Sequence, residues 1–575
     1  MSAHLNQSRR RFLSQSALGL FACASMPGLL HAMEGMGDMP RTKPNLANPN
    51  FNPDVEFDLH CRNTSISILP GATTQVQQYS ANLIKGPKDT LTDIPSSYLG
   101  PIIRLQKGQK VRIRLHNHLA EPTITHWHGL HVPANMDGHP VYVIDPGVKF
   151  VYEFEVLNRA GMNIYHPHPH DATAKQVYHG LAGALLVNDE EEAALGLPSG
   201  SYEIPIVIQD RLFSAQNQLI YARNMHDRMT GFYGDKILVN GRPDFKLDVE
   251  SRAYRLRVLN GSTARIYKLA WDDGSPITII GVDGGLLEKP EIKPYVMLAP
   301  GERLDVWADF SGRKAGSELV MRSKPFSGVL PHMMGGGMGG MMHANALPVG
   351  SDYPIFTVRV TKHVSDSPTL PTQLSKITRY QLQDTANPHN PVPISISESP
   401  MAMLLNGRPY AYNDVQAIEK IPVNSIQLIE ISHAHGGHGA SAKQATAEQS
   451  DEKPGQGMRH GMMGGMSMGG MGRMGGMSGG GMGGMGMMMT MAHPIHLHGQ
   501  SYQIFSRKID KGTQADYDTV SEGFINSGWK DTVLVMPGET VRIIKPFQDF
   551  KGLFMYHCHN LEHEDMGMMR DFLVE

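Results

Sequence analysis

Seven His-x-His pairs constrain this chain more than any other feature of its sequence. Chance placement of 28 histidines among 575 residues would give only one or two such pairs. On a β-strand, residues i and i+2 point to the same face, so each pair can present two imidazoles to one place. The pairs are His116/His118, His126/His128, His166/His168, His168/His170, His433/His435, His496/His498 and His557/His559. The pattern predicts strands that carry metal ligands.

Four motifs hold the strongest of these pairs, and two come early in the chain while two come late. They are "THWHGLH" (125–131), "YHPHPHD" (165–171), "HPIHLHG" (493–499) and "YHCHNLEH" (556–563). We expect the early and late parts of the fold to meet, so that eight imidazoles converge. Eight imidazoles suit a cluster of several copper or zinc ions rather than a single ion.

Cys558 lies between two of these histidines, and on a strand it would face the opposite way. It can therefore join a second site with His493, His563 and Met568. One cysteine, two histidines and a weak methionine form the ligand set of a blue-copper electron-transfer site, where the metal stabilises the thiolate. One tripeptide would then connect two metal sites. Used in this way, Cys558 leaves Cys61 free, although a disulfide between two exported cysteines is the alternative.

Repeated glycine turns followed by alternating strands predict an all-β fold. The turns and strands recur as "KGQKVRIRL" (107–115), "PGERLDVWADF" (300–310) and "PGETVRIIK" (537–545), and "LVNGRP" (238–243) is echoed by "LLNGRP" (404–409). Such recurrence favours three related β-sandwich domains in series. We place them at residues 50–195, 200–365 and 395–575, the last with a Met/Gly-rich insertion at 458–491.

The four motifs, in this order, resemble those of the multicopper oxidases, and the resemblance extends from about residue 50 to 575. It implies three consecutive cupredoxin-like Greek-key domains and four copper ions. Substrate would be oxidised one electron at a time at a type 1 copper, and O2 reduced to water at a cluster of the other three ions. The implied ligands are, for type 1, His493, Cys558, His563 and Met568; for type 2, His126 and His496; for the type 3 pair, His128, His166, His168, His498, His557 and His559.

Two carboxylates match the acidic residues that supply protons in this family. Asp137 matches the one near the type 2 copper, and Glu564, directly after His563, matches the one on the type 3 side. Both can act as general acids if their pKa values are tuned. The alternative for each is a structural or solvated carboxylate.

The N-terminus predicts export. "SRRRFLSQ" (8–15) precedes an apolar stretch, which is typical of a twin-arginine signal peptide over residues 1–32. An ordinary secretory signal is the alternative. We therefore expect a periplasmic monomer that engages the twin-arginine export machinery and has no stable membrane insertion. The net charge of −3 gives no reason to expect nucleic acid as a partner.

Methionine is the best indication of the substrate, because thioethers prefer Cu(I). The chain has 37 methionines, and the Met/Gly segment runs directly into His493 through Met489 and Met491. This resembles the bacterial copper-efflux and copper-resistance oxidases, which oxidise Cu(I) to Cu(II), although Met489 occupies a position where that family has Asp. The alternatives are a laccase-type phenol oxidase and a copper-binding sink. A copper nitrite reductase would need fewer histidines.

Overall fold

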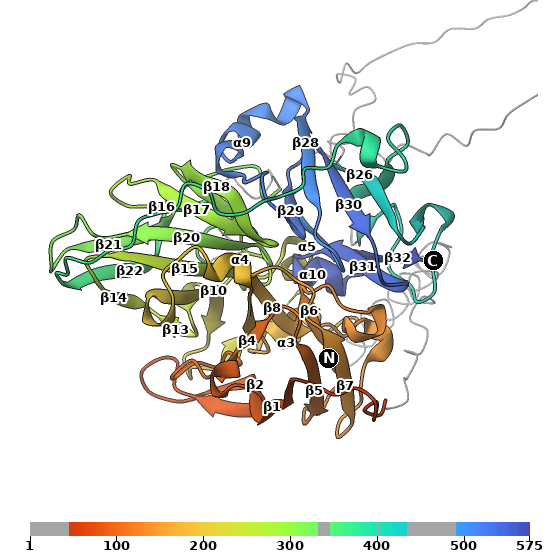
Figure 1. The fold of residues 1–575 in the computed structure, drawn as a ribbon. Coiled ribbons are helices and arrows are strands. Elements are labelled where there is room, and N and C mark those ends of the chain that lie inside the picture. The colour runs from red at the N-terminus through yellow and green to blue at the C-terminus, as the bar shows by residue number, and fades with distance from the viewer. Residues whose placement is uncertain (1–44, 223, 332–345, 400–401, 434–489) are drawn as a thin grey trace, which may run out of the picture.

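Three β-sandwiches follow one another along the chain in the computed structural model (Figure 1). The structure describes residues 45–222, 224–331, 346–399, 402–433 and 490–575. The predicted signal peptide and nearly all of the Met/Gly insertion, Met489 included, lie outside the described residues. The all-β prediction of three cupredoxin-like domains is confirmed, while the exact domain boundaries stay predictions.

The first sandwich packs a sheet in the order β2-β1-β5-β7 against a sheet in the order β3-β4-β9-β8-β6. Alternation explains the packing: Val111, Ile113 and Leu115 of β5 are buried, while the residues between them are partly exposed. The strands are β1 (Val55–Ile66), β2 (Thr74–Lys85), β3 (Leu91–Thr92), β4 (Ile102–Gln106), β5 (Lys110–Asn117), β6 (Thr125–His128), β7 (Lys149–Glu155), β8 (Gly161–Pro167) and β9 (Gly183–Asn188).

The second sandwich has a large sheet in the order β13-β12-β10-β15-β20-β17-β18, with β11 paired to β10, and a sheet in the order β14-β22-β21-β16-β19. The strands are β10 (Glu203–Phe213), β11 (Leu219–Ile220), β12 (Lys236–Val239), β13 (Arg242–Pro243), β14 (Lys246–Glu250), β15 (Ala253–Asn260), β16 (Tyr267–Trp271), β17 (Ile277–Val282), β18 (Gly285–Lys293), β19 (Val296–Leu298), β20 (Arg303–Asp309), β21 (Glu318–Ser323) and β22 (Tyr353–Lys362).

The third sandwich packs the order β24-β23-β26-β30-β28 against the order β25-β32-β31-β27-β29. The strands are β23 (Val392–Ser399), β24 (Ala402–Leu405), β25 (Lys420–Ile421), β26 (Ser425–His433), β27 (His493–Leu497), β28 (Gln503–Ile509), β29 (Thr532–Val535), β30 (Glu539–Phe547), β31 (Gly552–Cys558) and β32 (Met569–Val574).

The same pairings recur in all three sandwiches. A parallel pair forms in one sheet of each (β1–β5, β10–β15, β23–β26) and another in the opposite sheet (β4–β9, β14–β22, β25–β32). Three related domains are therefore confirmed. The predicted correspondence of the two Asn-Gly turns is confirmed as well, because Asn240 and Asn406 follow the equivalent strands β12 and β24 with the same φ of 53°.

The prediction that the three glycine-turn stretches form equivalent strands is wrong for one of them. "KGQKVRIRL" forms β5, whose counterparts are β15 and β26, whereas the other two stretches form β20 and β30. The counterpart of β20 and β30 in the first domain is β7, which follows the turn at Gly147. Several strands of each domain begin after a glycine turn and alternate in burial, so the pattern alone does not distinguish neighbouring strands.

Short helices lie between the sandwiches and around the centre of the molecule (Figure 1). The α-helices are α3 (Thr173–Tyr178), α4 (Glu190–Ala193), α5 (Met225–Thr230), α9 (Gln514–Asp518) and α10 (Leu561–Asp565). Within the described part of the chain, no helix has the length and apolar character needed to cross a membrane.

Candidate metal centre

The eight histidines of the four motifs meet between the first and third domains. β6 pairs with β8, which sets His126 opposite His166, and β27 pairs with β31, which sets His496 opposite His557. The two pairs of strands then face each other: His168 Nε2 lies 3.4 Å from His557 Nε2. All eight side chains are buried. The predicted convergence of early and late motifs is confirmed.

Three overlapping groups of their ring nitrogens can be recognised, in each of which the candidate ligand atoms lie within 4.8 Å of one another. His559 Nε2 is also 3.2 Å from His128 Nδ1, from the other side of the interface. The groups are His126/His128/His166, His126/His496/His498 and His168/His498/His557. This arrangement suits several ions that share one cavity rather than one ion.

Hydrogen bonds behind the rings decide which nitrogen faces the centre. His126 Nδ1 donates to the carbonyl of Asp137 over 2.5 Å, and His496 Nδ1 donates to the carbonyl of Asp531 over 2.9 Å. The Nε2 atoms of His126, His166 and His496 are buried and have no hydrogen-bond partner among the described residues. A buried nitrogen without a partner is costly unless something binds it, so these atoms are candidate metal ligands.

Burial favours the neutral form of several of these imidazoles, which is the form that binds metal. Burial and the neighbouring rings lower the pKa of His166 and His168 well below the usual value. Burial lowers the pKa of His496 to about 3, although Asp531 opposes the shift. His166, His168 and His496 are therefore unprotonated near neutral pH.

Cys558 faces away from this cluster, as the alternation predicts. Its Sγ lies 3.4 Å from His493 Nδ1 and 3.7 Å from His563 Nδ1, and these three ligand atoms form a separate group. Met568 is fully buried in the same core, and its carbonyl accepts a hydrogen bond from the Cys558 amide. Burial raises the pKa of the Cys558 thiol, so only a bound cation would stabilise its thiolate.

The outer ring nitrogens of His493 and His563 also form hydrogen bonds. His493 Nε2 donates to Glu398 Oε1 over 2.9 Å, and His563 Nε2 donates to the carbonyl of Met229 over 3.1 Å. Each bond leaves Nδ1 free to face the sulfur. Glu398 lies near the end of β23, and Met229 lies in α5 of the second domain.

Family models described as multicopper oxidase match residues 75–192 and residues 483–575, the two regions that carry the four motifs. The chain belongs to the multicopper oxidase family. "Multicopper oxidase mco" of Staphylococcus aureus is 28% identical over 503 residues, which cover 87% of this chain and 88% of that protein. The laccase of Bacillus subtilis strain 168 is 27% identical and covers 88% of both chains.

A solved structure shares the fold over almost the whole chain. The McoA multicopper oxidase of Aquifex aeolicus is 28% identical, covers 93% of this chain and 100% of its own, and has a TM-score of 0.67. The expected all-β architecture and the expected enzyme class are therefore both confirmed.

Copper is the cofactor of a multicopper oxidase, in type 1, type 2 and type 3 sites, and the residues present fit it. The unpartnered Nε2 atoms suit the type 2 and type 3 ions, and the sulfur with two imidazoles suits type 1. Bound copper would supply one-electron chemistry and the reduction of O2 to water. The assignment of each histidine to one ion stays a prediction.

The two predicted proton donors contact different histidines of the cluster. Asp137 Oδ2 accepts from His498 Nδ1 over 2.8 Å, and its Oδ1 is buried without a hydrogen-bond partner in the described structure. Burial raises the pKa of Asp137, and His126 offsets part of the rise. Glu564 lies 3.5 Å from His168 Nδ1 and 3.0 Å from His557 Nδ1. Both carboxylates lie beside candidate ligands, and their role as proton donors stays a prediction.

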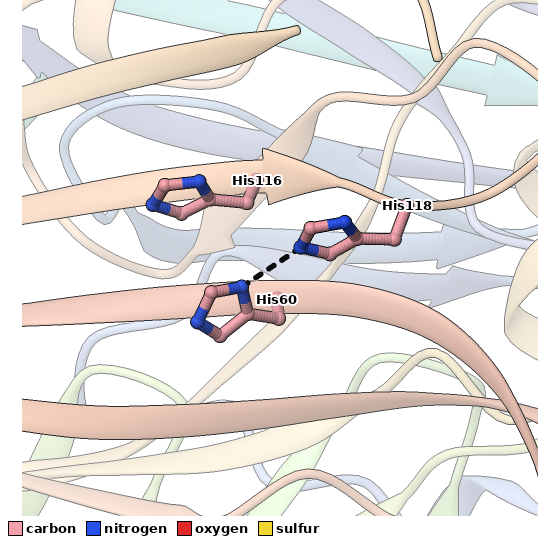
Figure 2. Close-up of side chains that lie close together, drawn as sticks. All are labelled: His60, His116 and His118. Carbon is pink, nitrogen blue, oxygen red and sulfur yellow. Dashed lines mark hydrogen bonds between the residues drawn. The ribbon is translucent and has the colours of Figure 1, made fainter. Parts of the chain in front are cut away.

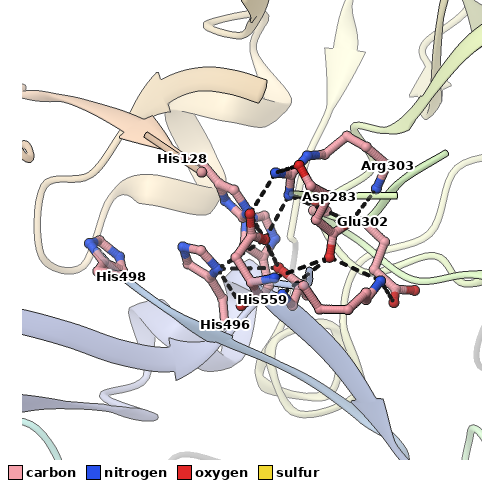
Figure 3. Close-up of polar contacts among 12 residues, drawn as sticks. His128, Asp283, Glu302, Arg303, His496, His498 and His559 are labelled. Carbon is pink, nitrogen blue, oxygen red and sulfur yellow. Dashed lines mark hydrogen bonds and ion pairs between the residues drawn. The ribbon is translucent and has the colours of Figure 1, made fainter. Parts of the chain in front are cut away.

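The sequence does not predict the buried ionic network that contacts His128 and His496 (Figure 3). Asp531 Oδ1 accepts from His128 Nε2 over 3.1 Å, and both Asp531 oxygens bind Arg303 of β20 in the second domain. Asp283 binds Lys530 over 2.9 Å and extends the network. In the sequence, Arg303 alternates in step with Asp305 on the polar side of the strand, and that pattern does not reveal a buried partner.

Two further predictions concern Cys61 and the methionines that precede His493. Cys61 is free and buried in the first domain's core, as expected if Cys558 serves a metal. Met491 is buried, and its amide donates to Glu398 Oε1 over 2.8 Å, which places it beside the type 1 ligands. Whether Met491 binds substrate copper stays a prediction, as does the same role for Met489, which lies outside the described residues.

Proposed function

We propose that this multicopper oxidase oxidises Cu(I) to Cu(II), couples that reaction to the reduction of O2 to water, and thereby serves copper tolerance. The observation that carries the proposal is a carboxylate, Glu398, which joins His433 to the type 1 ligand His493. The family pattern places an acidic residue at the position of Met489. The proposed site instead takes its carboxylate from β23.

The three side chains are buried together at the edge of the type 1 site. Glu398 Oε2 accepts from His433 Nε2 over 3.2 Å, while Glu398 Oε1 accepts from His493 Nε2 over 2.9 Å. Burial alone would raise the pKa of Glu398, but His433 and His493 hold it well below the usual range. The carboxylate is therefore charged and can attract a cation.

His433 offers the ligand atom that a Cu(I) ion needs. Because its Nε2 donates to Glu398, its Nδ1 keeps a lone pair, and that atom is buried without a hydrogen-bond partner among the described residues. Imidazole and thioether are both good ligands for Cu(I). An electron released beside Glu398 would have a hydrogen-bonded path through His493 to Cys558.

Two further parts of the proposal concern the Met/Gly segment and the N-terminus, which lie almost entirely outside the described residues. The segment at 458–491 would gather Cu(I) through its thioethers and deliver it to Glu398 and His433. The signal peptide at 1–32 would direct the enzyme through the twin-arginine machinery to the periplasm, where we expect a monomer.

Phenol oxidation is the alternative, because relatives named laccase match over most of the chain. A copper sink is a weaker alternative, since a sink has no need of Cys558 between two sites.

The variant His433→Ala tests the proposal. It should lower kcat/KM for Cu(I) at least about tenfold, because a ligand of the substrate ion is lost. The variant His389→Ala is the matched control: His389 is exposed and precedes β23, whereas Glu398 lies near the far end of that strand. kcat/KM for ferrocyanide, a one-electron donor that needs no copper-binding ligand, should stay unchanged in both variants.

Two outcomes would overturn the proposal. If His433→Ala oxidises Cu(I) as fast as His389→Ala, the residue does not bind the substrate ion. If both substrates slow equally while the visible absorption of the type 1 copper changes, His433 supports the type 1 site instead.

A further inference from the structure

Three histidines gather on the outer face of the first domain, away from the histidines of the metal centre. His60 lies on β1, His116 on β5, and His118 just beyond the end of β5 (Figure 2). The predicted copper ligands His126 and His166 lie on β6 and β8, which belong to the other sheet of this sandwich. Neither the copper sites nor the proposed substrate site uses the three outer histidines.

Strand pairing brings the three rings together. β1 and β5 run parallel with His60 directly beside His116, and the amide of His118 continues the ladder by donating to the carbonyl of Cys61. His116 and His118 are two residues apart, so both point to the same face as His60. The neighbouring Cys61 and Asn117 are buried, which fixes the histidines outward.

The ring nitrogens have the spacing of a metal site. His60 Nδ1 and His118 Nε2 are 3.0 Å apart, and one candidate ligand atom from each of the three histidines lies within 4.8 Å of the others. The rings of His60 and His116 stack with centroids 4.7 Å apart. One shared proton can satisfy the short nitrogen–nitrogen contact, but a metal ion satisfies all three rings.

Polar side chains also contact the outer nitrogens of two of these rings. Asp58 Oδ1 accepts from His116 Nε2 over 3.1 Å, which leaves His116 Nδ1 as the ligand atom. Asn82 Nδ2 lies 3.2 Å from His60 Nε2. With the amide turned so that its oxygen accepts from Nε2–H, Asn82 holds the outer side of that ring and leaves His60 Nδ1 for the metal. Carboxylates and amides behind ligand histidines orient the rings and strengthen their binding of metal.

We infer that His60, His116 and His118 form an accessory surface site for a divalent transition-metal ion, with Cu²⁺ preferred over Zn²⁺. Three imidazoles suit both ions, and Cu²⁺ binds nitrogen ligands more tightly than Zn²⁺. The fourth position faces solvent and would hold water, because His118 is exposed. The inference does not rest on the proposed substrate, since it needs only the ligand geometry.

A metal ion here would tie together two strands that are far apart in the sequence. Because it binds the folded protein and not the unfolded chain, it would raise the melting temperature in proportion to the logarithm of its concentration. The binding would leave oxidase activity unchanged, because none of the three histidines belongs to the metal centre.

Metal titration of the copper-loaded enzyme tests the site. Calorimetry with Zn²⁺, and separately with Cu²⁺, should show one more bound ion for the unaltered enzyme than for the double variant His60→Ala/His118→Ala. Asp58→Asn should keep that ion but weaken its binding about 10- to 100-fold. His389→Ala is the matched control for the loss of an exposed histidine.

Comparison with the double variant separates this site from any other metal-binding segment of the chain. Equal numbers of bound Zn²⁺ and Cu²⁺ ions in the unaltered enzyme and the double variant would overturn the inference. So would a melting temperature that rises equally in both when either ion is added. If the double variant fails to fold, His116→Gln and Asp58→Asn provide the same comparison with smaller changes.

Discussion

Cys558 and its two flanking histidines serve different sites because side chains alternate across β31. His557 and His559 join the histidine cluster, while Cys558 packs with His493 and His563 on the opposite face. This could be predicted from the sequence because it depends only on neighbours along one strand. Glu398, by contrast, could not be predicted, because it lies in no motif that links it to His493, which it contacts only in the folded chain.

Asp137 gives a prediction at this scale. Asp137→Asn should lower turnover of O2 about 10²- to 10⁴-fold, because the amide cannot donate a proton beside the ligands. The raised pKa of Asp137 keeps the carboxyl protonated to higher pH than usual, so turnover by the unaltered enzyme should fall as pH rises through it. The variant should lose that dependence.

O2 uptake at several pH values, with copper content measured for each protein, checks this prediction. Asp89→Asn, an exposed carboxyl in the same domain, is the control. A fully copper-loaded Asp137→Asn enzyme with normal turnover would exclude Asp137 as a proton donor.

At the scale of elements, repeats could be recognised but not aligned. The glycine turns showed that three sandwiches follow one another, and the pairings of β1–β5, β10–β15 and β23–β26 confirm this. The match of "KGQKVRIRL" to β20 and β30 was wrong, because the strand that pairs with each segment is fixed by the fold and not by local pattern. The local sequence pattern does not predict the buried ion pairs between strands either.

Glu203 at the start of β10 provides the element-scale prediction. It binds Arg257 over 2.8 Å and Arg104 of β4 over 2.9 Å, and so joins the first domain to the second. Burial raises the pKa of Glu203, but Arg257, Arg255 and Arg104 together lower it to about 2. The stabilisation is therefore complete above about pH 4.5 and is lost as pH falls toward 2.

Glu203→Gln should lower the free energy of unfolding by about 3 kcal/mol at pH 7, and the difference should shrink progressively below pH 4.5. Urea unfolding followed by circular dichroism at several pH values measures it. Glu190→Gln, an exposed neighbour in α4, should change little. A difference that is constant from pH 7 to pH 3 would contradict the assigned pKa.

At the scale of the molecule, the metal centre exists because the first and third domains meet, and the second domain braces that interface. Arg303 reaches from β20 to Asp531, which in turn holds His128 (Figure 3). The convergence could be predicted, because four paired motifs had to share one centre. The bracing could not, because it depends on the relative placement of three domains.

Deletion of Met458–Met489 tests how the whole chain acquires its substrate. We expect kcat/KM for Cu(I) to fall at least about tenfold, because the thioethers that collect Cu(I) are removed. Oxidation of 2,6-dimethoxyphenol without added Cu(II) should stay at the level of the unaltered enzyme or rise, because the metal centre lies in the described residues that remain. Unchanged kinetics with both substrates would make the segment a passive connection.

The central claim is that Cu(I) is the substrate, and O2 uptake by the copper-loaded enzyme tests it most directly. Uptake is measured with Cu(I) and, separately, with 2,6-dimethoxyphenol in the presence and absence of added Cu(II). We predict fast uptake with Cu(I), and turnover of the phenol only when Cu(II) is added. Fast phenol turnover without added Cu(II), together with slow uptake with Cu(I), would contradict the claim and identify the enzyme as a laccase.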